Sequence, residues 1–304
     1  MAVTAKMVKE LRERTGAGMM DCKNVLVETD GDIDKAIELL REKGLAKAAK
    51  KAGRVASQGL VKLAFSEEGK KAAAIEVNSE TDFVAKNEEF IDFVSTLADI
   101  VLDSNVADMD TFLSLNYKDE GTIKDALNSK IAKIGENMSI RRFVKFEKPG
   151  VVHVGYVHGG GKIGVIIGLE TEASLEDITV LGKDIAMQVA SMNPKYIDES
   201  AVDPAYIENE KNIFMTQAKN EGKPEEIAKK MAIGRMKKQL TEICLTEQKF
   251  VKNSDITVSE YIDETAKALG KTIKVVEMVR YEVGEGIEIE EENFAEEVAK
   301  QMNN

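Results

Sequence analysis

The chain has 304 residues, a length that suits about two domains, and its formal net charge at pH 7 is −12. Binding to nucleic acid depends mainly on cationic side chains at phosphates, so this acidic balance argues against nucleic acid as the main partner. No window reaches the roughly 18 apolar residues of a membrane helix, and the N-terminus lacks the apolar core of a signal peptide. The two cysteines, Cys22 and Cys244, lie far apart and give no disulfide framework, so a reducing cytoplasm is the expected location.

Residues 1–54 are predicted to form a small domain of three helices. The first helix ends at the run TGAG, the second follows Asp21, and the third begins at the N-cap in GDID and ends at Gly44. Three short helices are close to the smallest unit that folds alone, so this domain is expected to need a partner or the rest of the chain. The basic run from Lys47 to Arg54 is interpreted as a solvated helix end and linker, because no aromatic residues are interleaved with it for base stacking.

Residues 55–148 are predicted to form a first α+β lobe. VASQGLVKLAF and KAAAIEV alternate like strands joined by the turn SEEGK, a long amphipathic helix follows, a helical region covers about 108–135, and SIRRFVKFEK is again a strand. A second lobe, residues 149–192 and 235–286, is predicted to repeat this plan in HVGYVHGGGKIGVIIGLETE and the helix after it. Its remainder is a helix at 258–269 and the strand TIKVVEMVRYEVG, so the predicted fold class is α+β with two related core lobes.

Residues 193–234 are predicted to be an insertion between the two parts of the second lobe. Two helical patterns, PAYIENEKNIFMTQAKN and PEEIAKKMAIGRMKKQL, indicate a helical hairpin. Its apolar seam must be covered, so a coiled-coil arm that forms a homodimer and a hairpin closed by its own seam are equal alternatives. Residues 287–304 are predicted to form a C-terminal module, an acidic helix with a small apolar face.

Several patterns could carry chemistry, but each has a better structural interpretation. GGGKIG, Gly159 to Gly164, matches the G-x-G-x-x-G of phosphate loops, yet a strand follows it where such a loop needs a helix N-terminus, so a hairpin turn is predicted. His153 and His158 are expected on opposite faces of a strand, with no cysteine nearby to share a metal. Cys22 begins a helix, which can lower a thiol pKa, but a small buried residue is the favoured interpretation. No metal site, cofactor, direct nucleotide binding or catalytic group is expected.

Three apolar residues could belong to the core or to a binding surface. Met19 and Met20 follow two glycines between helices, and methionine is common in both settings, so the core is the favoured interpretation. Phe83 stands early in a helix that follows NSE, where water usually reaches. It lies seven residues before Phe90, which on an ideal helix places it in the buried stripe, so the residues alone slightly favour the core.

Six stretches occur in order along the chain: VKELRERTGAGMMDCKNVL, EVNSETDFVAKN, YVHGGGKIGVII, QVASMNPKYI, GKPEEIAKKM and RYEVGEGIE. Together they strongly resemble the bacterial translation elongation factor Ts family, and the likeness covers nearly the whole chain. This family is the guanine-nucleotide exchange factor for elongation factor Tu. The resemblance implies an N-terminal three-helix ubiquitin-associated-like domain, two α+β core lobes, a coiled-coil dimerisation hairpin and a C-terminal module.

The resemblance also implies two groups of contacts with elongation factor Tu. The first group matches the family's TDFV stretch: Thr81, Asp82, Phe83 and Val84. In the second group, Arg12, Met19 and Met20 would touch the partner's GTPase domain. His158 would touch another domain of the partner. The C-terminal helix would add a further contact.

In the family, the TDFV stretch lies against the GTPase domain near its magnesium site. By this correspondence Phe83 wedges between partner elements, Mg²⁺ is displaced, and GDP leaves so that GTP can bind. Asp82 would cap the helix that carries the wedge. A second hypothesis is a non-catalytic scaffold whose ubiquitin-associated-like domain binds some other protein, and an enzyme is a distant third.

Overall fold

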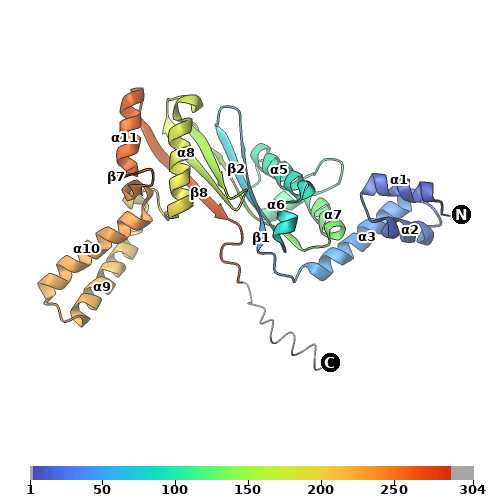
Figure 1. The fold of residues 1–304 in the computed structure, drawn as a ribbon, viewed down its shortest axis with the longest axis horizontal. Helices are drawn as coiled ribbons and strands as arrows, with labels where there is room; N and C mark the ends of the chain where they lie inside the picture. Colours follow the sequence, from blue (N-terminus) through green and yellow to red (C-terminus); the bar gives the residue numbers. More distant parts are fainter. Residues whose placement is uncertain (1–2, 289–304) are drawn as a thin grey trace.

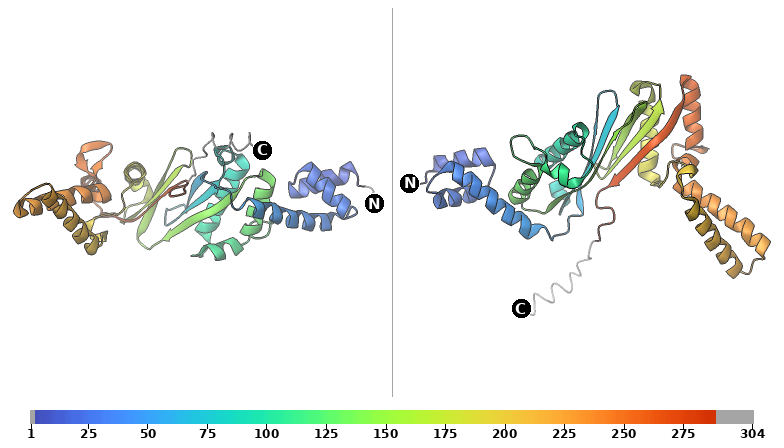
Figure 2. Two further views of the ribbon diagram at one scale, coloured as in Figure 1. Left: turned by 90° about the horizontal axis from the view of Figure 1, so that it is seen from below. Right: turned by 180° about the vertical axis from the view of Figure 1, so that it is seen from behind.

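The computed structural model describes residues 3–288, which form an elongated molecule with three parts in a row (Figures 1 and 2). A three-helix domain lies at one end, two sheets with helices on their outer sides form the middle, and a helical hairpin projects at the other end. The predicted α+β class is confirmed. The C-terminal module expected at 287–304 lies outside the described residues except for its first two. None of the described helices is long and apolar enough to span a bilayer.

The N-terminal domain packs three helices around a small apolar core. They are α1 (Ala5–Thr15), α2 (Met19–Glu28) and α3 (Ile33–Lys51). Two expected boundaries are wrong: α2 begins at Met19 rather than after Asp21, and α3 continues through Gly44 to Lys51. The residues after Gly44 are strong helix formers, and a Cβ built at Gly44 would lie only 3.5 Å from Ala132 Cβ of α7 (Ile123–Ile134), so α3 gains a packing partner where it was expected to end.

The first lobe contains an antiparallel sheet of order β1-β2-β3. Its elements are β1 (Gln58–Phe65), β2 (Lys71–Ser79), α4 (Asp82–Ala85), α5 (Glu88–Asp103), α6 (Met109–Ser114), α7 and β3 (Met138–Glu147). Helix α5 packs against one face of the sheet and buries Phe90, Phe93 and Leu97. The strands and the main helix therefore lie where the hydrophobic period predicted them.

The second lobe has the same plan, an antiparallel sheet of order β4-β5-β8 with α8 against its outer face. Its elements are β4 (Val151–His158), β5 (Ile163–Thr171), α8 (Leu175–Met192), β6 (Lys249–Phe250), β7 (Asn253–Thr257), α11 (Val258–Leu269) and β8 (Ile273–Glu282). In both lobes the register between the second and third strands shifts once, after Glu76 and after Gly168. The short pair β6–β7 was not predicted.

The two sheets pack face to face, so the middle of the molecule has the layers helix, sheet, sheet, helix (Figure 1). Ala72 and Ala74 of β2 meet Ile166 of β5 between the sheets. Because α5 covers the other face, every residue of β2 from Ala72 to Ser79 is buried. Small residues at this contact let the two backbones approach closely.

The insertion is a helical hairpin of α9 (Pro204–Asn220) and α10 (Glu225–Ile243). Residue 234, the expected end of the insertion, lies in the middle of α10, so the second helix runs on into the base of the second lobe. Small residues line the seam and a larger cluster closes the base: Ala218, Ala228, Ala232, Val202, Met236, Leu240 and Cys244. Ile213, Ile227 and Ile233 stay exposed on the hairpin.

Candidate functional site

Phe83 lies on a corner between β2 and α5, and the residue is 81% exposed. The short helix α4 ends at Ala85, and Asn87 then starts α5 by accepting a hydrogen bond from Glu89 N at 2.8 Å. This break removes Phe83 from the helical phase of Phe90, so the slight preference for the core was wrong. The residues that follow Phe83 are Val84 and Ala85, both 7% exposed, and they anchor the corner.

Thr81 is the N-cap of α4, with an extended backbone and a side-chain Oγ1 that accepts from Val84 N at 3.4 Å. The expectation that Asp82 caps this helix is therefore corrected, because Asp82 is the first residue inside it. Lys86 Nζ donates to Asp82 Oδ2 at 2.6 Å. This hydrogen bond and the positive charges of Lys86 and Lys162 hold the pKa of Asp82 below its ordinary value.

The corner is held from outside by the loop between α7 and β3, which sequence analysis did not single out. Glu136 accepts two hydrogen bonds from Thr81, from N to Oε2 at 3.0 Å and from Oγ1 to Oε1 at 2.7 Å. Asn137 N donates to the Glu80 carboxylate, and Arg54 Nη1 lies 3.5 Å from Glu80 Oε2. The sequence held one indication that an acidic residue from elsewhere binds Thr81. Val84 occupies the position three residues after Thr81, where a capping box needs an acidic side chain.

The methionines of the N-terminal domain are also exposed, Met19 by 57% and Met20 by 63%, so the favoured core interpretation was wrong. They occupy the first turn of α2 after Gly18, which offers no side-chain cap, and the apolar face of that helix begins at Cys22. Arg12 is exposed on α1. Cys22 is fully buried as predicted, and burial raises the pKa of its thiol.

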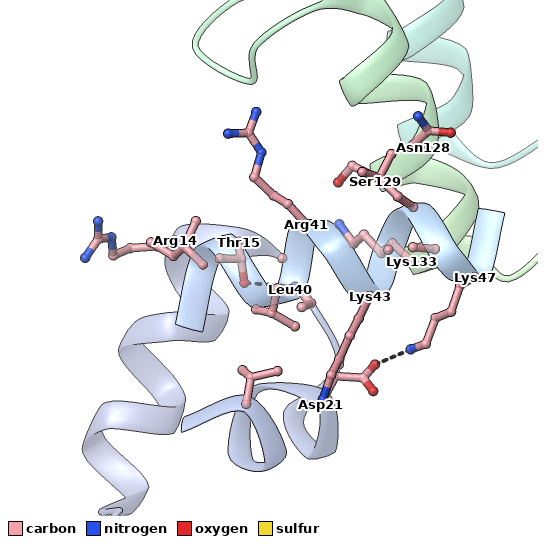
Figure 3. Close-up of a pocket in the computed structure, with 18 of the residues that line it drawn as sticks. Arg14, Thr15, Asp21, Leu40, Arg41, Lys43, Lys47, Asn128, Ser129 and Lys133 are labelled. Carbon is pink, nitrogen blue, oxygen red and sulfur yellow. Dashed lines mark hydrogen bonds and ion pairs between the residues drawn. The ribbon is translucent and has the colours of Figure 1, made fainter. Parts of the chain in front are cut away.

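A cavity of about 860 Å³ opens between the three-helix domain and α7 (Figure 3). Charged and polar side chains from both sides line it, among them Arg14, Asp21, Arg41, Lys43, Lys47, Ser129 and Lys133. Several of these charges are paired: Lys47 Nζ lies 3.0 Å from Asp21 Oδ2, and Lys43 contacts Glu28. Gly18, the residue before Met19, also lines the cavity, whereas Met19 and Met20 are not among its lining residues.

The two histidines lie on opposite faces of β4, as predicted. His153 is buried, with Nε2 2.7 Å from Glu277 Oε2 and Nδ1 2.9 Å from the Gly69 carbonyl oxygen. His158 is exposed at the end of the strand, and its Nδ1 lies 3.0 Å from the Tyr156 hydroxyl. Across residues 3–288, no group of three or more His, Cys, Asp or Glu side chains is arranged to hold a metal ion.

GGGKIG forms the hairpin turn between β4 and β5, as predicted. Gly159, Gly160 and Gly161 have φ values of 58°, 66° and 104°, which only glycine adopts readily. Val61 N of β1 donates to the Gly161 carbonyl at 2.7 Å, and the charge of Lys162 acts on Asp82. The fold thus brings this turn of the second lobe beside the corner of the first, while the methionines lie on the separate N-terminal domain (Figure 1).

Comparisons with known proteins agree over almost the whole chain. The family model described as Elongation factor TS matches residues 80–285, which begin at this corner, after β1 and β2, and include the rest of the first lobe, the second lobe and the hairpin. Elongation factor Ts of Clostridioides difficile strain 630 is 55% identical over 300 residues, 99% of each chain. Elongation factor Ts of Clostridium novyi strain NT is 55% identical over 303 residues, and that of Clostridium botulinum strain Alaska E43 is 53% identical over 300, again with 99% of each chain covered.

Proposed function

Since this chain belongs to the elongation factor Ts family and promotes guanine-nucleotide exchange on elongation factor Tu, we propose that it acts through the corner Thr81–Val84, with Phe83 as a wedge. The wedge enters the partner's GTPase domain near its magnesium site. The displaced Mg²⁺ then no longer neutralises the phosphates, and GDP is released. GTP can bind afterwards.

The exposure of Phe83 is the observation that carries this proposal. A phenylalanine side chain gains roughly 1.5–3 kcal/mol when it is removed from water, and this fold leaves almost all of that gain unused. Phe83 lies in helix α4, and the next two residues, Val84 and Ala85, are buried and anchor that helix to the first lobe. An apolar side chain held in this way suits insertion into another protein.

Linkage explains how binding can expel a nucleotide without any phosphate-binding loop on this chain. A protein that binds the nucleotide-free GTPase more tightly than the loaded GTPase must weaken nucleotide binding by the same factor. The exchange therefore needs differential binding and no covalent chemistry.

Further contacts belong to the same proposal. Arg12, Met19 and Met20 on the N-terminal domain would touch the GTPase domain, and His158 would touch another domain of the partner. Their exposure supports these assignments. A homodimer through the hairpin stays a prediction, supported by the exposed Ile213, Ile227 and Ile233 on its surface.

The test is the rate of GDP release from elongation factor Tu, followed with a fluorescent GDP analogue in the presence of excess unlabelled GTP. We expect micromolar concentrations of this protein to accelerate release in a saturable way. Release at the unstimulated rate would contradict the proposal and leave the scaffold hypothesis, in which the exposed Met19 and Met20 bind a different protein.

A further inference from the structure

Three helix starts in the described part of the chain have a complete capping box, which α4 lacks. In this box a Thr or Ser N-cap and an acidic residue three positions later bond each other's backbone: Thr122 with Asp125, Ser174 with Asp177, and Thr257 with Glu260. In α4 the N-cap is Thr81, but the residue three positions later is Val84. A valine side chain cannot accept the second hydrogen bond of the box, which comes from the backbone N–H of the N-cap residue.

Glu136 supplies the missing acceptor from outside the helix. It accepts from Thr81 N at 3.0 Å and from Thr81 Oγ1 at 2.7 Å, although it lies 55 positions along the chain. In α11, Glu260 accepts from Thr257 N at 2.7 Å and from Thr257 Oγ1 at 3.2 Å. Both sites therefore pair a threonine with a glutamate through the same two hydrogen bonds. In α11 the glutamate belongs to the same helix, whereas at α4 it comes from a distant loop.

The acidic residue comes from another element because Val84 is needed in the core. Val84 packs into the core of the first lobe, so its position cannot hold a carboxylate. Helix α4 also has only four residues, too few to keep its own conformation without outside contacts. The direction in which Phe83 points therefore depends on whatever fixes Thr81.

The loop that carries Glu136 is itself fastened on both sides. Lys51 Nζ donates to the Gly135 carbonyl, and Asn137 Nδ2 donates to the Arg54 carbonyl at 2.7 Å, so the loop is tied to the end of α3 and the segment after it. Asn137 N also donates to Glu80, the neighbour of Thr81. A carboxylate on such a loop can hold Thr81 in one place.

We propose that Glu136 is a positioning residue for nucleotide exchange, which sets the angle at which Phe83 enters the GTPase by holding Thr81. The inference rests on the proposed wedge role of Phe83 and goes beyond it. It places a requirement for exchange on a side chain that lies outside the TDFV stretch.

The experiment compares Glu136→Ala, Glu136→Gln, Phe83→Ala and the double variant Phe83→Ala/Glu136→Ala in stimulated GDP release. We expect Glu136→Ala to lower the maximal release rate by roughly five-fold, the equivalent of one lost cap, while the half-saturating concentration changes less than about two-fold. Glu136→Gln should recover most of the rate, because its amide can accept from Thr81 N and donate to Thr81 Oγ1. In the Phe83→Ala background, Glu136→Ala should have no further effect on the rate.

Glu260→Ala is the matched control, since it removes the same kind of bonds from the N-cap of α11. It should lower the melting temperature about as much as Glu136→Ala and leave exchange unchanged. The inference is overturned if Glu136→Ala and Glu260→Ala give the same exchange rate, or if Glu136→Ala slows exchange equally with and without Phe83. If Phe83→Ala itself exchanges normally, the wedge proposal fails first and this inference fails with it.

Discussion

At the residue scale, the side chains at the corner divide their roles between the core and the solvent. Val84 and Ala85 are buried in the first lobe, whereas Phe83 between Asp82 and Val84 is 81% exposed. A single turn of helix produces this division because successive side chains point about 100° apart. The stability of the corner therefore comes from Val84 and Ala85, and Phe83 is free to serve a contact with another molecule.

Replacing Phe83 with alanine should separate stability from exchange. We expect Phe83→Ala to change the free energy of unfolding by less than about 0.5 kcal/mol, because the ring makes few contacts within the fold. Stimulated GDP release should slow by roughly 10- to 100-fold, which corresponds to the loss of about 1.5–3 kcal/mol of apolar burial at the interface. Urea unfolding and the fluorescence assay measure the two effects.

Phe90→Ala is the control for that experiment, because Phe90 of α5 is fully buried in the core of the first lobe. It should cost about 3–5 kcal/mol of stability. A loss of that size in Phe83→Ala would mean that the ring is part of the core in solution.

At the element scale, helix α3 connects the N-terminal domain to the first lobe and extends beyond Gly44, where the sequence predicted its end. It runs from Ile33 to Lys51 and packs along α7, with Gly44 opposite Ala132. Glycine in a helix interior costs backbone entropy, but a helix that is packed against a neighbour tolerates that cost. The local signal for a helix end was therefore overridden by a tertiary contact.

Gly44→Ala should stabilise the protein. The substitution removes about 0.5–1 kcal/mol of unfavourable helix propensity, and the new methyl group would meet Ala132 Cβ at 3.5 Å, an ordinary van der Waals distance. Thermal unfolding should show a higher midpoint.

Gly234→Ala in α10 serves as the comparison, since a Cβ there would have no described atom within 4 Å. It should give the propensity gain alone, so any extra stabilisation in Gly44→Ala measures the contact with Ala132. If Gly44→Ala lowers the midpoint while Gly234→Ala raises it, α3 and α7 have no room for a methyl group between them.

At the scale of the whole molecule, the two lobes form one unit because their sheets pack closely. Gly164 of β5 faces Val61 of β1, and a Cβ at Gly164 would lie 2.4 Å from Val61 Cγ1. Contacts of this kind bring the β4–β5 turn beside the corner that holds Phe83, with Val61 N bonded to the Gly161 carbonyl. The geometry of the candidate site therefore depends on both lobes.

Gly164→Ala should push the sheets apart and destabilise the protein by about 1–3 kcal/mol, as overpacking does in other cores. Chemical denaturation provides the measurement. Adding Val61→Ala should recover part of the loss, because it removes Cγ1 of Val61, the atom that the new methyl group would meet.

Gly53→Ala provides a neutral reference, because a Cβ at Gly53 would have no described atom within 4 Å and its backbone needs no positive φ. Its effect should stay within about 0.5 kcal/mol. Equal effects of the two substitutions would show that the sheets are not in close contact at Gly164.

Local patterns in the sequence were sufficient for most elements. Alternation placed the main strands, the period of 3.6 placed α5 and α8, and the run GGGKIG was assigned to a hairpin turn because a strand follows it. These features depend on residues close together in the chain, so they can be derived without knowing the fold. The TDFV stretch was singled out by resemblance, and its role stays a prediction.

The sequence by itself determined the α+β class, the order of the elements and the burial of Cys22. Only the tertiary structure decided that Phe83 and Met19 are exposed to solvent. It also decided that Thr81 rather than Asp82 is the N-cap of α4, and that α3 continues beyond Gly44. The physical reason is that each of these depends on a contact or a break that residue type does not encode. The bond between Thr81 and Glu136 spans 55 positions, and only the folded chain brings such partners together.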